Sequence, residues 1–131
     1  MIYLDSSALL RLVHQERESD ALEKWLSRNP TIPLVSSQLA RIEVIRATRR
    51  INPDVVPAAV ALLDSLDLIP ISTEIVDRAS LIGDSSLRSL DAVHLASATA
   101  IQGDLTSFVA YDARLADAAT TAGLATDQPG A

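Results

Sequence analysis

Short apolar runs alternate along this chain with longer stretches that repeat apolar side chains at helical spacing. Val56, Val60 and Leu63 illustrate that spacing, in which residues three and four apart share one face of a helix. Short buried strands separated by helices are typical of βα units and a parallel sheet. The pattern therefore predicts an α/β fold. The apolar runs predicted as strands are 2–4, 33–35, 68–71 and 108–111.

Residues that cap helices well follow these runs, so the helices have defined starts. Asp5 or Ser6 follows the first run and Asp112 follows the last. Such side chains accept hydrogen bonds from the free N–H groups of a first helical turn. Pro53 and Pro57 mark a break and a first turn. Helices are predicted at 7–15, 18–28, 37–50, 55–66, 74–83, 88–102 and 113–122.

Length and composition favour one domain with an aliphatic core. The chain has 131 residues, of which 48% are hydrophobic and only 3% aromatic. Dividing it would leave pieces too small to bury enough apolar surface. We therefore predict a single domain over 1–125, followed by a flexible C-terminal tail at 126–131, where the sequence TDQPGA has no periodicity.

Cysteine usage, the N-terminal segment and net charge narrow the classes of function. The absence of cysteine excludes disulfides, thiolate nucleophiles and cysteine-ligated zinc. The first apolar run has no basic leader and is broken at Asp5, so a cytoplasmic location is expected. A net charge of −6 argues against broad attraction to nucleic acid, although it leaves room for a local basic patch.

Asp5 and Asp112 repeat one construction, an apolar strand followed by an aspartate and a helix. Taken singly, each aspartate is more often a helix cap than a catalytic group. As a pair they would lie at the carboxyl ends of parallel strands, where α/β folds bind ligands. Two carboxylates held close together are unfavourable unless a cation lies between them.

Glu43 and Asp91 are the other acids in apolar surroundings. Glu43 lies among isoleucines and valine, so its helix face turns toward the core and its carboxylate is expected to be poorly solvated. The alternative is a surface glutamate paired with Arg46 or Arg50. Asp91 interrupts a run of leucine, alanine and valine, and its alternative is a first-turn aspartate stabilised by the helix dipole and Ser89.

No nearby lysine or arginine is available to neutralise all four acids at once, and Lys24 is the only lysine of the chain, so a divalent metal is the simplest way to balance their charge. Mg²⁺ and Mn²⁺ prefer carboxylate and water oxygens, and they activate water against phosphate esters. The acids therefore favour phosphodiester hydrolysis with Mg²⁺, or Mn²⁺ as the alternative.

Across roughly residues 1–125 the chain resembles the PIN-domain ribonucleases, in particular the VapC-type toxins of toxin–antitoxin pairs. The motifs that carry the resemblance are YLDSSALL, RIEVIRA, LRSLDAVHLASA and AYDARLADAA, in the family's order and with similar separations. The DSSAL start and the LDAVHLA segment together are specific, whereas either alone is weak. The resemblance implies a PIN-like three-layer α/β/α domain whose mostly parallel central sheet has four to five short strands.

The resemblance also implies an endoribonuclease site. By position, the family's catalytic, metal-binding acids correspond to Asp5, Glu43, Asp91 and Asp112. Ser6 matches a small hydroxyl residue beside the first acid, while Ser7 stands where many relatives have asparagine. For substrate binding we single out Ser6, Ser7, Arg46 and Arg50, the arginines being equally well explained as an ordinary solvated face. His94 is interpreted as a buried structural histidine.

Partners follow from the same resemblance. It implies a VapB-type antitoxin that covers the active-site groove, an RNA substrate, and a homodimer within a toxin–antitoxin complex. No membrane partner is expected. An apolar first pair of helices offers a surface for the antitoxin, although core packing explains it equally: Leu9, Leu10, Leu12, Val13, Leu22, Trp25 and Leu26.

Two alternative functions compete with the ribonuclease interpretation. A haloacid-dehalogenase-like phosphotransferase also begins with a strand and an aspartate. Its chemistry needs a second aspartate, where this chain has Ser7, and a lysine late in the sequence, which this chain lacks. The other rival is a catalytically silent PIN-like module that binds protein or RNA. Loss of one or more acids would mark it, and this chain keeps them all.

Overall fold

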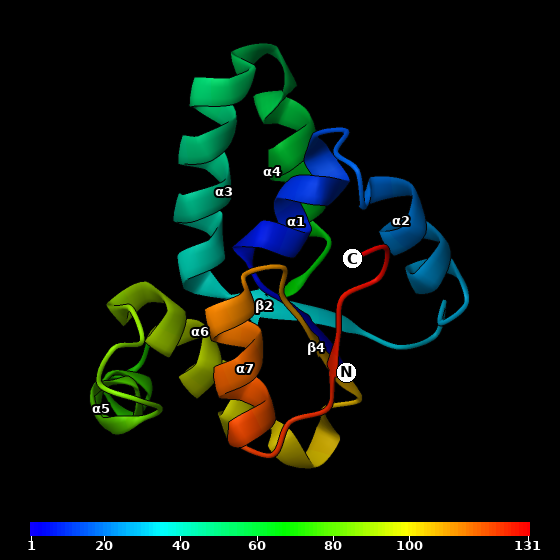
Figure 1. The fold of residues 1–131 in the computed structure, drawn as a ribbon. Coiled ribbons are helices and arrows are strands. Elements are labelled where there is room, and N and C mark those ends of the chain that lie inside the picture. Colours follow the sequence, from blue (N-terminus) through cyan, green and yellow to red (C-terminus); the bar gives the residue numbers. More distant parts are fainter.

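The computed structural model describes residues 1–131 as a parallel sheet held between two layers of helices (Figure 1). All strand pairs are parallel, in the order β3-β2-β1-β4-β5. The strands are β1 Ile2–Leu4, β2 Leu34–Ser37, β3 Asp67–Ile69, β4 Ser107–Val109 and β5 Thr126–Asp127. The predicted three-layer α/β/α architecture is confirmed.

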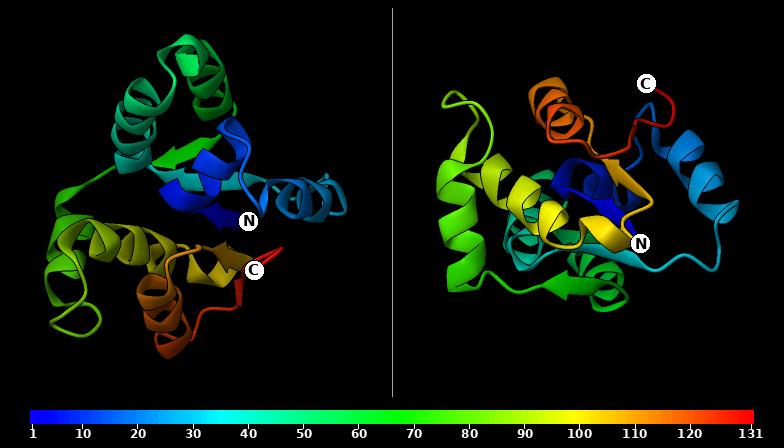
Figure 2. Two further views of the ribbon diagram at one scale, coloured as in Figure 1. Left: turned by 45° about the horizontal axis from the view of Figure 1, so that its top comes forward. Right: turned by 90° about the horizontal axis from the view of Figure 1, so that it is seen from below.

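Seven α-helices connect the strands, close to the ranges that the periodicity predicts. They are α1 Ser6–Val13, α2 Ser19–Ser27, α3 Gln38–Ile51, α4 Val56–Asp64, α5 Thr73–Leu81, α6 Ser89–Ala100 and α7 Ala113–Thr121, with short 3-10 turns at Pro53–Val55 and Gln102–Asp104. Figure 2 shows α1 to α4 on one side of the sheet and α5 to α7 on the other.

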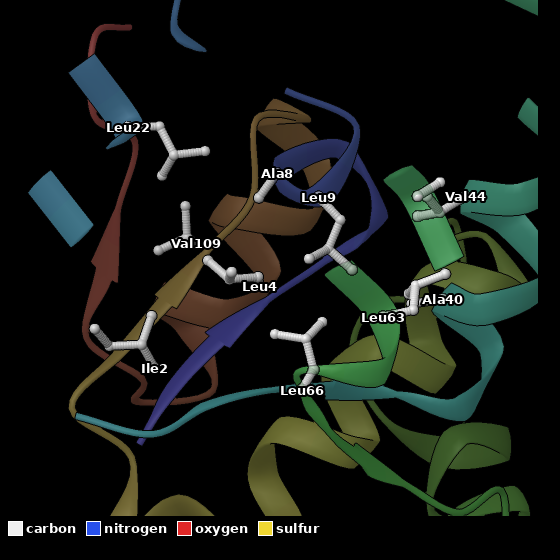
Figure 3. Packing of buried hydrophobic residues seen from close by; sticks show 11 residues of the cluster. Ile2, Leu4, Ala8, Leu9, Leu22, Ala40, Val44, Leu63, Leu66 and Val109 are labelled. Carbon is white, nitrogen blue, oxygen red and sulfur yellow. The ribbon is translucent and has the colours of Figure 1, made fainter. Parts of the chain in front are cut away.

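The pleat of the central strand divides the core into two clusters. Ile2 and Leu4 point into the cluster under α1 to α4, whereas Tyr3 points into the cluster under α6 and α7. Figure 3 shows the first of these clusters, in which Leu9 lies between Leu4 of β1 and Leu63 of α4. Because both of its faces are covered, the central strand β1 has the continuous apolar sequence IYL.

The strand order places a topological switch point between β1 and β4. From β1 the chain adds β2 and β3 on one side, then returns to place β4 and β5 on the other. The carboxyl ends of two such neighbouring strands open a crevice, because the connections leave them in opposite directions. Asp5 and Asp112 follow β1 and β4 at this edge.

Several predicted boundaries require correction. The strand expected at 33–35 is Leu34–Ser37, that at 68–71 is Asp67–Ile69, and that at 108–111 is Ser107–Val109. Proline has no N–H for the sheet, which explains why Pro33 and Pro70 lie outside their strands.

The tail predicted at 126–131 is wrong in its first residues, because β5 pairs with β4 there. Ser107 fixes the pairing by donating a 2.6 Å hydrogen bond to Asp127. The stabilising contacts lie far away in sequence, so the segment shows no local pattern.

The apolar first pair of helices is used mainly for the core. Leu9 and Leu22 are fully buried, and Trp25 and Leu26 pack against the same cluster. Core packing therefore accounts for this apolar surface. None of the helices combines the length and apolar character that crossing a membrane requires.

Candidate active site

Asp5 lies at the carboxyl end of β1 and is 4% exposed. Its Oδ1 caps α1 by accepting a 3.0 Å bond from the N–H of Ala8, and it accepts a second bond, at 2.6 Å, from the hydroxyl of Ser7. The cap interpretation is therefore correct. It does not exclude a second role, because no protein group donates to Oδ2.

Asp112 repeats this arrangement beside it. Its Oδ1 caps α7 by accepting a 3.0 Å bond from the N–H of Leu115. Unlike Asp5, the residue is exposed. The two strand-Asp-helix turns are thus neighbours in space, as their repeated sequence predicts.

Glu43 reaches the site from the second turn of α3, with a side chain 27% exposed. Its Oε1 accepts hydrogen bonds from the hydroxyl of Ser6 and from Nε2 of His94, both at 2.7 Å. Neither Arg46 nor Arg50 pairs with it, so the interpretation as a surface ion pair is wrong.

Asp91 occupies the first turn of α6, as predicted, and is half-buried. The cap residue Arg88 makes no side-chain bond to the helix. The free N–H groups and dipole of the helix end therefore support the negative charge of Asp91. His94 lies one turn further along the same helix.

The carboxylates influence one another electrostatically. Burial raises the pKa of Asp5, and the carboxylate of Asp91 raises it further against the opposing effect of His94. Burial and then the carboxylate of Asp112 raise the pKa of Asp91. Like charges therefore meet at this edge of the sheet, which is the condition that a bound cation relieves.

Glu43 behaves differently from these aspartates. Partial burial acts to raise its pKa, but the hydrogen bonds from His94 and Ser6 outweigh burial and leave the pKa lowered. The charged carboxylate is the form that accepts both bonds. Glu43 is therefore the member of the group whose negative charge the protein stabilises most directly.

The donor set suits a hydrated divalent ion rather than a closed metal cage. No three histidine, aspartate or glutamate side chains are arranged so that they could hold a metal ion. Mg²⁺ needs no such cage, because it usually binds through one or two carboxylates and keeps several waters. Asp5 and Glu43 each leave one oxygen without a protein donor. Since no buried side-chain oxygen lacks a partner, these oxygens contact solvent.

Most of the predicted substrate-binding residues lie on or beside this group. Ser6 bonds to Glu43, and Ser7 bonds to Asp5 and accepts the N–H of Tyr111 at 2.9 Å. Both hydroxyls are thus used within the protein, and their contact with substrate stays a prediction. Arg46 and Arg50 are exposed, on the face of α3 that carries Glu43.

His94 and Tyr3 take part in the site to a degree that sequence reasoning missed. His94 is 2% exposed, as a buried structural histidine should be, yet Nε2 bonds to Glu43 and Nδ1 to the hydroxyl of Tyr3, both at 2.7 Å. Burial raises the pKa of Tyr3 well above its usual value, so the hydroxyl keeps its proton. The available signals were the spacing from Asp91 to His94 and the two-residue step from Tyr3 to Asp5.

Comparison with solved structures supports the fold. VapC20 of Mycobacterium tuberculosis, described as a Sarcin-Ricin loop cleaving toxin, superposes with a TM-score of 0.77 at 14% identity, covering 98% of this chain and 100% of that one. A toxin–antitoxin complex from Klebsiella pneumoniae gives a TM-score of 0.65 at 20% identity, covering 86% of this chain and 87% of that one. At these identities the likeness concerns the fold alone.

Sequence relatives carry the assignment further. The family model of the PIN domain matches residues 2–120. Ribonuclease VapC47 of Mycobacterium tuberculosis is 40% identical over 134 residues, covering 100% of this chain and 98% of the relative. Ribonuclease VapC46 of the same organism is 42% identical, covering 98% of this chain and 97% of the relative. The chain belongs to the PIN domain family and, within it, to the VapC group.

Proposed function

We propose that this protein is a metal-dependent endoribonuclease that hydrolyses RNA phosphodiester bonds. The observation that carries the proposal is that acids from separate segments meet at the switch point of the sheet, where Asp91 repels each of the other three carboxylates, those of Asp5, Glu43 and Asp112. Glu43 is also tied to the helix of Asp91 by its hydrogen bond with His94. The names of the relatives, which are ribonucleases, support the same chemistry.

In this proposal one or two of the carboxylates of Asp5, Glu43 and Asp91 would bind the ion directly, the others would orient its water ligands, and Asp112 would complete the set. When bound, Mg²⁺ or Mn²⁺ supplies a more acidic water and positive charge against the phosphate. The protein contributes a fixed arrangement of oxygens, because hydrogen bonds already hold one oxygen of Asp5, Glu43 and Asp112.

Arg46 and Arg50 are proposed to bind the phosphates that flank the cleaved bond. Both lie on the helix face of Glu43, and neither forms an ion pair within the chain. Their charges are therefore available to RNA despite the overall charge of −6.

Cleavage of total RNA by the purified protein tests the nuclease. We expect discrete fragments with Mg²⁺ or Mn²⁺, and none with EDTA or with Asp91→Asn. The matched control is Asp77→Asn, which makes the same change at an exposed aspartate of α5 and should cleave like the wild type. A folded but inert wild type would favour the silent binding module instead.

We further propose that the protein is the toxin of a toxin–antitoxin pair with a VapB-type antitoxin. The VapC names of the relatives and the likeness to a solved toxin–antitoxin complex support this. Induced expression should arrest bacterial growth, whereas Asp91→Asn should not, and a co-expressed VapB-type partner should restore growth. Arrest by the Asp91→Asn variant would separate toxicity from cleavage.

A homodimer within that complex is also proposed. Large apolar side chains remain exposed on α5 and α6, among them Val76, Leu81 and Leu90. Leu81 is 89% exposed, which is unfavourable for an isolated chain in water. Light scattering should give twice the chain mass, and a charged Leu81→Asp variant should give the monomer mass.

A further inference from the structure

Tyr3, His94 and Glu43 form a buried chain of hydrogen bonds that runs from the core to the edge of the sheet. The hydroxyl of Tyr3 lies 2.7 Å from Nδ1 of His94, and Nε2 of His94 lies 2.7 Å from Oε1 of Glu43. Tyr3 is 0% exposed and His94 is 2% exposed. Neither side chain can touch RNA, so any contribution to the reaction must pass through a neighbouring group, and Glu43 is the acid that hydrogen-bonds to His94.

We propose that Tyr3 and His94 are positioning residues that hold Glu43 with its second oxygen, Oε2, directed to the ion and the substrate. This inference rests on the proposed nuclease function, and it assigns a role to residues outside the acid set.

The directions of the hydrogen bonds support the assignment. A carboxylate only accepts, so Nε2 of His94 donates to Glu43. In the neutral ring Nδ1 has no proton, and it then accepts the hydroxyl proton of Tyr3. Each group thus sets the orientation of the next. Ser6 donates to the same Oε1 at 2.7 Å, so both donors hold Oε1 and leave Oε2 without a hydrogen-bond partner in the protein.

The base of the chain is itself rigid. The ring of Tyr3 stacks on Phe108, with ring centres 5.2 Å apart, and it meets His94 edge-on at 5.9 Å. Phe108 lies in β4, and His94 lies in α6, which packs on the same cluster. The hydrogen bonds therefore tie Glu43 on α3 to the central strands and to the helix that carries Asp91.

A position fixed in this way matters because a mobile glutamate would lose part of its binding energy in becoming ordered. Groups that orient a metal-binding side chain typically change metal affinity or activity by about 10- to 100-fold when removed. A purely structural pair would instead affect only folding stability.

Two conservative variants separate these possibilities. Tyr3→Phe removes only the hydroxyl, whereas His94→Gln replaces the ring with an amide that can still donate an N–H to Glu43 but has no counterpart of Nδ1 for Tyr3. The matched control is His14→Gln, because His14 is a half-buried histidine that likewise bonds to a hydroxyl, that of Thr48 at 3.0 Å, away from the acids. Circular dichroism and thermal unfolding establish that each variant is folded.

The first readout is Mn²⁺ binding to the RNA-free protein, followed by electron paramagnetic resonance. We expect Tyr3→Phe and His94→Gln to weaken binding by about 10-fold, and His14→Gln to leave it unchanged. In cleavage assays kcat should fall by at least about 10-fold while KM changes little. Wild-type Mn²⁺ affinity in folded Tyr3→Phe would overturn the inference.

A double-mutant cycle gives the decisive result even where His94→Gln fails to fold. In a Glu43→Gln background, Tyr3→Phe should weaken Mn²⁺ binding no further, because its effect passes through Glu43. An equal loss in both backgrounds would overturn the inference. A wild type that binds Mn²⁺ but cleaves no RNA would refute the proposed nuclease function. The double-mutant cycle of Mn²⁺ binding would then still test the positioning role of Tyr3. A wild type that binds no Mn²⁺ would refute both.

Discussion

Ser7 and Tyr111 are joined by a 2.9 Å hydrogen bond from the N–H of Tyr111 to the hydroxyl of Ser7, which links the turn after β1 to the turn after β4. The same hydroxyl donates to Asp5 at 2.6 Å. One small side chain thus fixes the distance between the two strand-Asp-helix turns.

Ser7→Ala should therefore loosen both turns. We expect the free energy of unfolding to fall by about 1 to 2 kcal/mol, since the N–H of Tyr111 and Oδ1 of Asp5 each lose a partner. Urea titration measures this change. Ser80→Ala, on the exposed face of α5, should stay within about 0.5 kcal/mol of the wild type. Equal stability of the two variants would show that the link has no energetic weight.

Asp5→Asn should be more stable than the wild type in EDTA. The buried carboxylate is poorly solvated and lies near Asp91, whereas asparagine removes the charge and still caps α1. Thermal unfolding in EDTA checks the direction of the change.

Added Mn²⁺ should reverse the order, because an ion that binds only the folded state stabilises it by mass action. The wild type should gain unfolding temperature with Mn²⁺, and Asp5→Asn should gain little. An Asp5→Asn variant that is less stable than the wild type in EDTA would contradict this account of the charge.

The C-terminal segment should support Asp112. Gln128 donates a 2.7 Å bond to the carbonyl of Ala110, and Tyr111 donates a 2.8 Å bond to that of Pro129. Burial raises the pKa of Tyr111 to about 12, so its hydroxyl remains a donor at neutral pH.

Gln128→Ala should lower stability by about 1 kcal/mol and slow cleavage, because the segment before Asp112 becomes freer. Gln38→Ala is the matched control, since Gln38 is exposed and makes no side-chain bond. Denaturant midpoints and initial cleavage rates test the prediction together. If removing residues 128–131 altogether changes neither quantity, the segment is dispensable.

Arg46→Ala and Arg50→Ala should weaken RNA binding without changing the chemical step. We expect KM to rise with kcat nearly constant, and the salt dependence of binding to decrease by about one phosphate contact for each arginine. Arg49→Ala is the control, because Arg49 is also exposed but, six residues after Glu43, points away from the face of α3 that carries Glu43. An identical effect of all three substitutions would indicate only general attraction.

The sequence by itself determined the local constructions of this protein. The strand at 2–4, Asp5 and the following helix could be predicted together, as could Asp112 and its helix, because caps and periodicity act within a few residues. Once parallel strands are predicted, their carboxyl ends must share an edge, so the neighbourhood of Asp5 and Asp112 followed as well.

Only the tertiary structure decided which side chains became partners. Glu43 could have paired with Arg46 on its own helix, but helix packing placed His94 and Ser6 against it. Likewise β5 formed in a segment without a pattern, because the edge of β4 was available to it. These contacts join residues tens of positions apart, and they depend on strand order and helix docking. Local propensity carries no information about either.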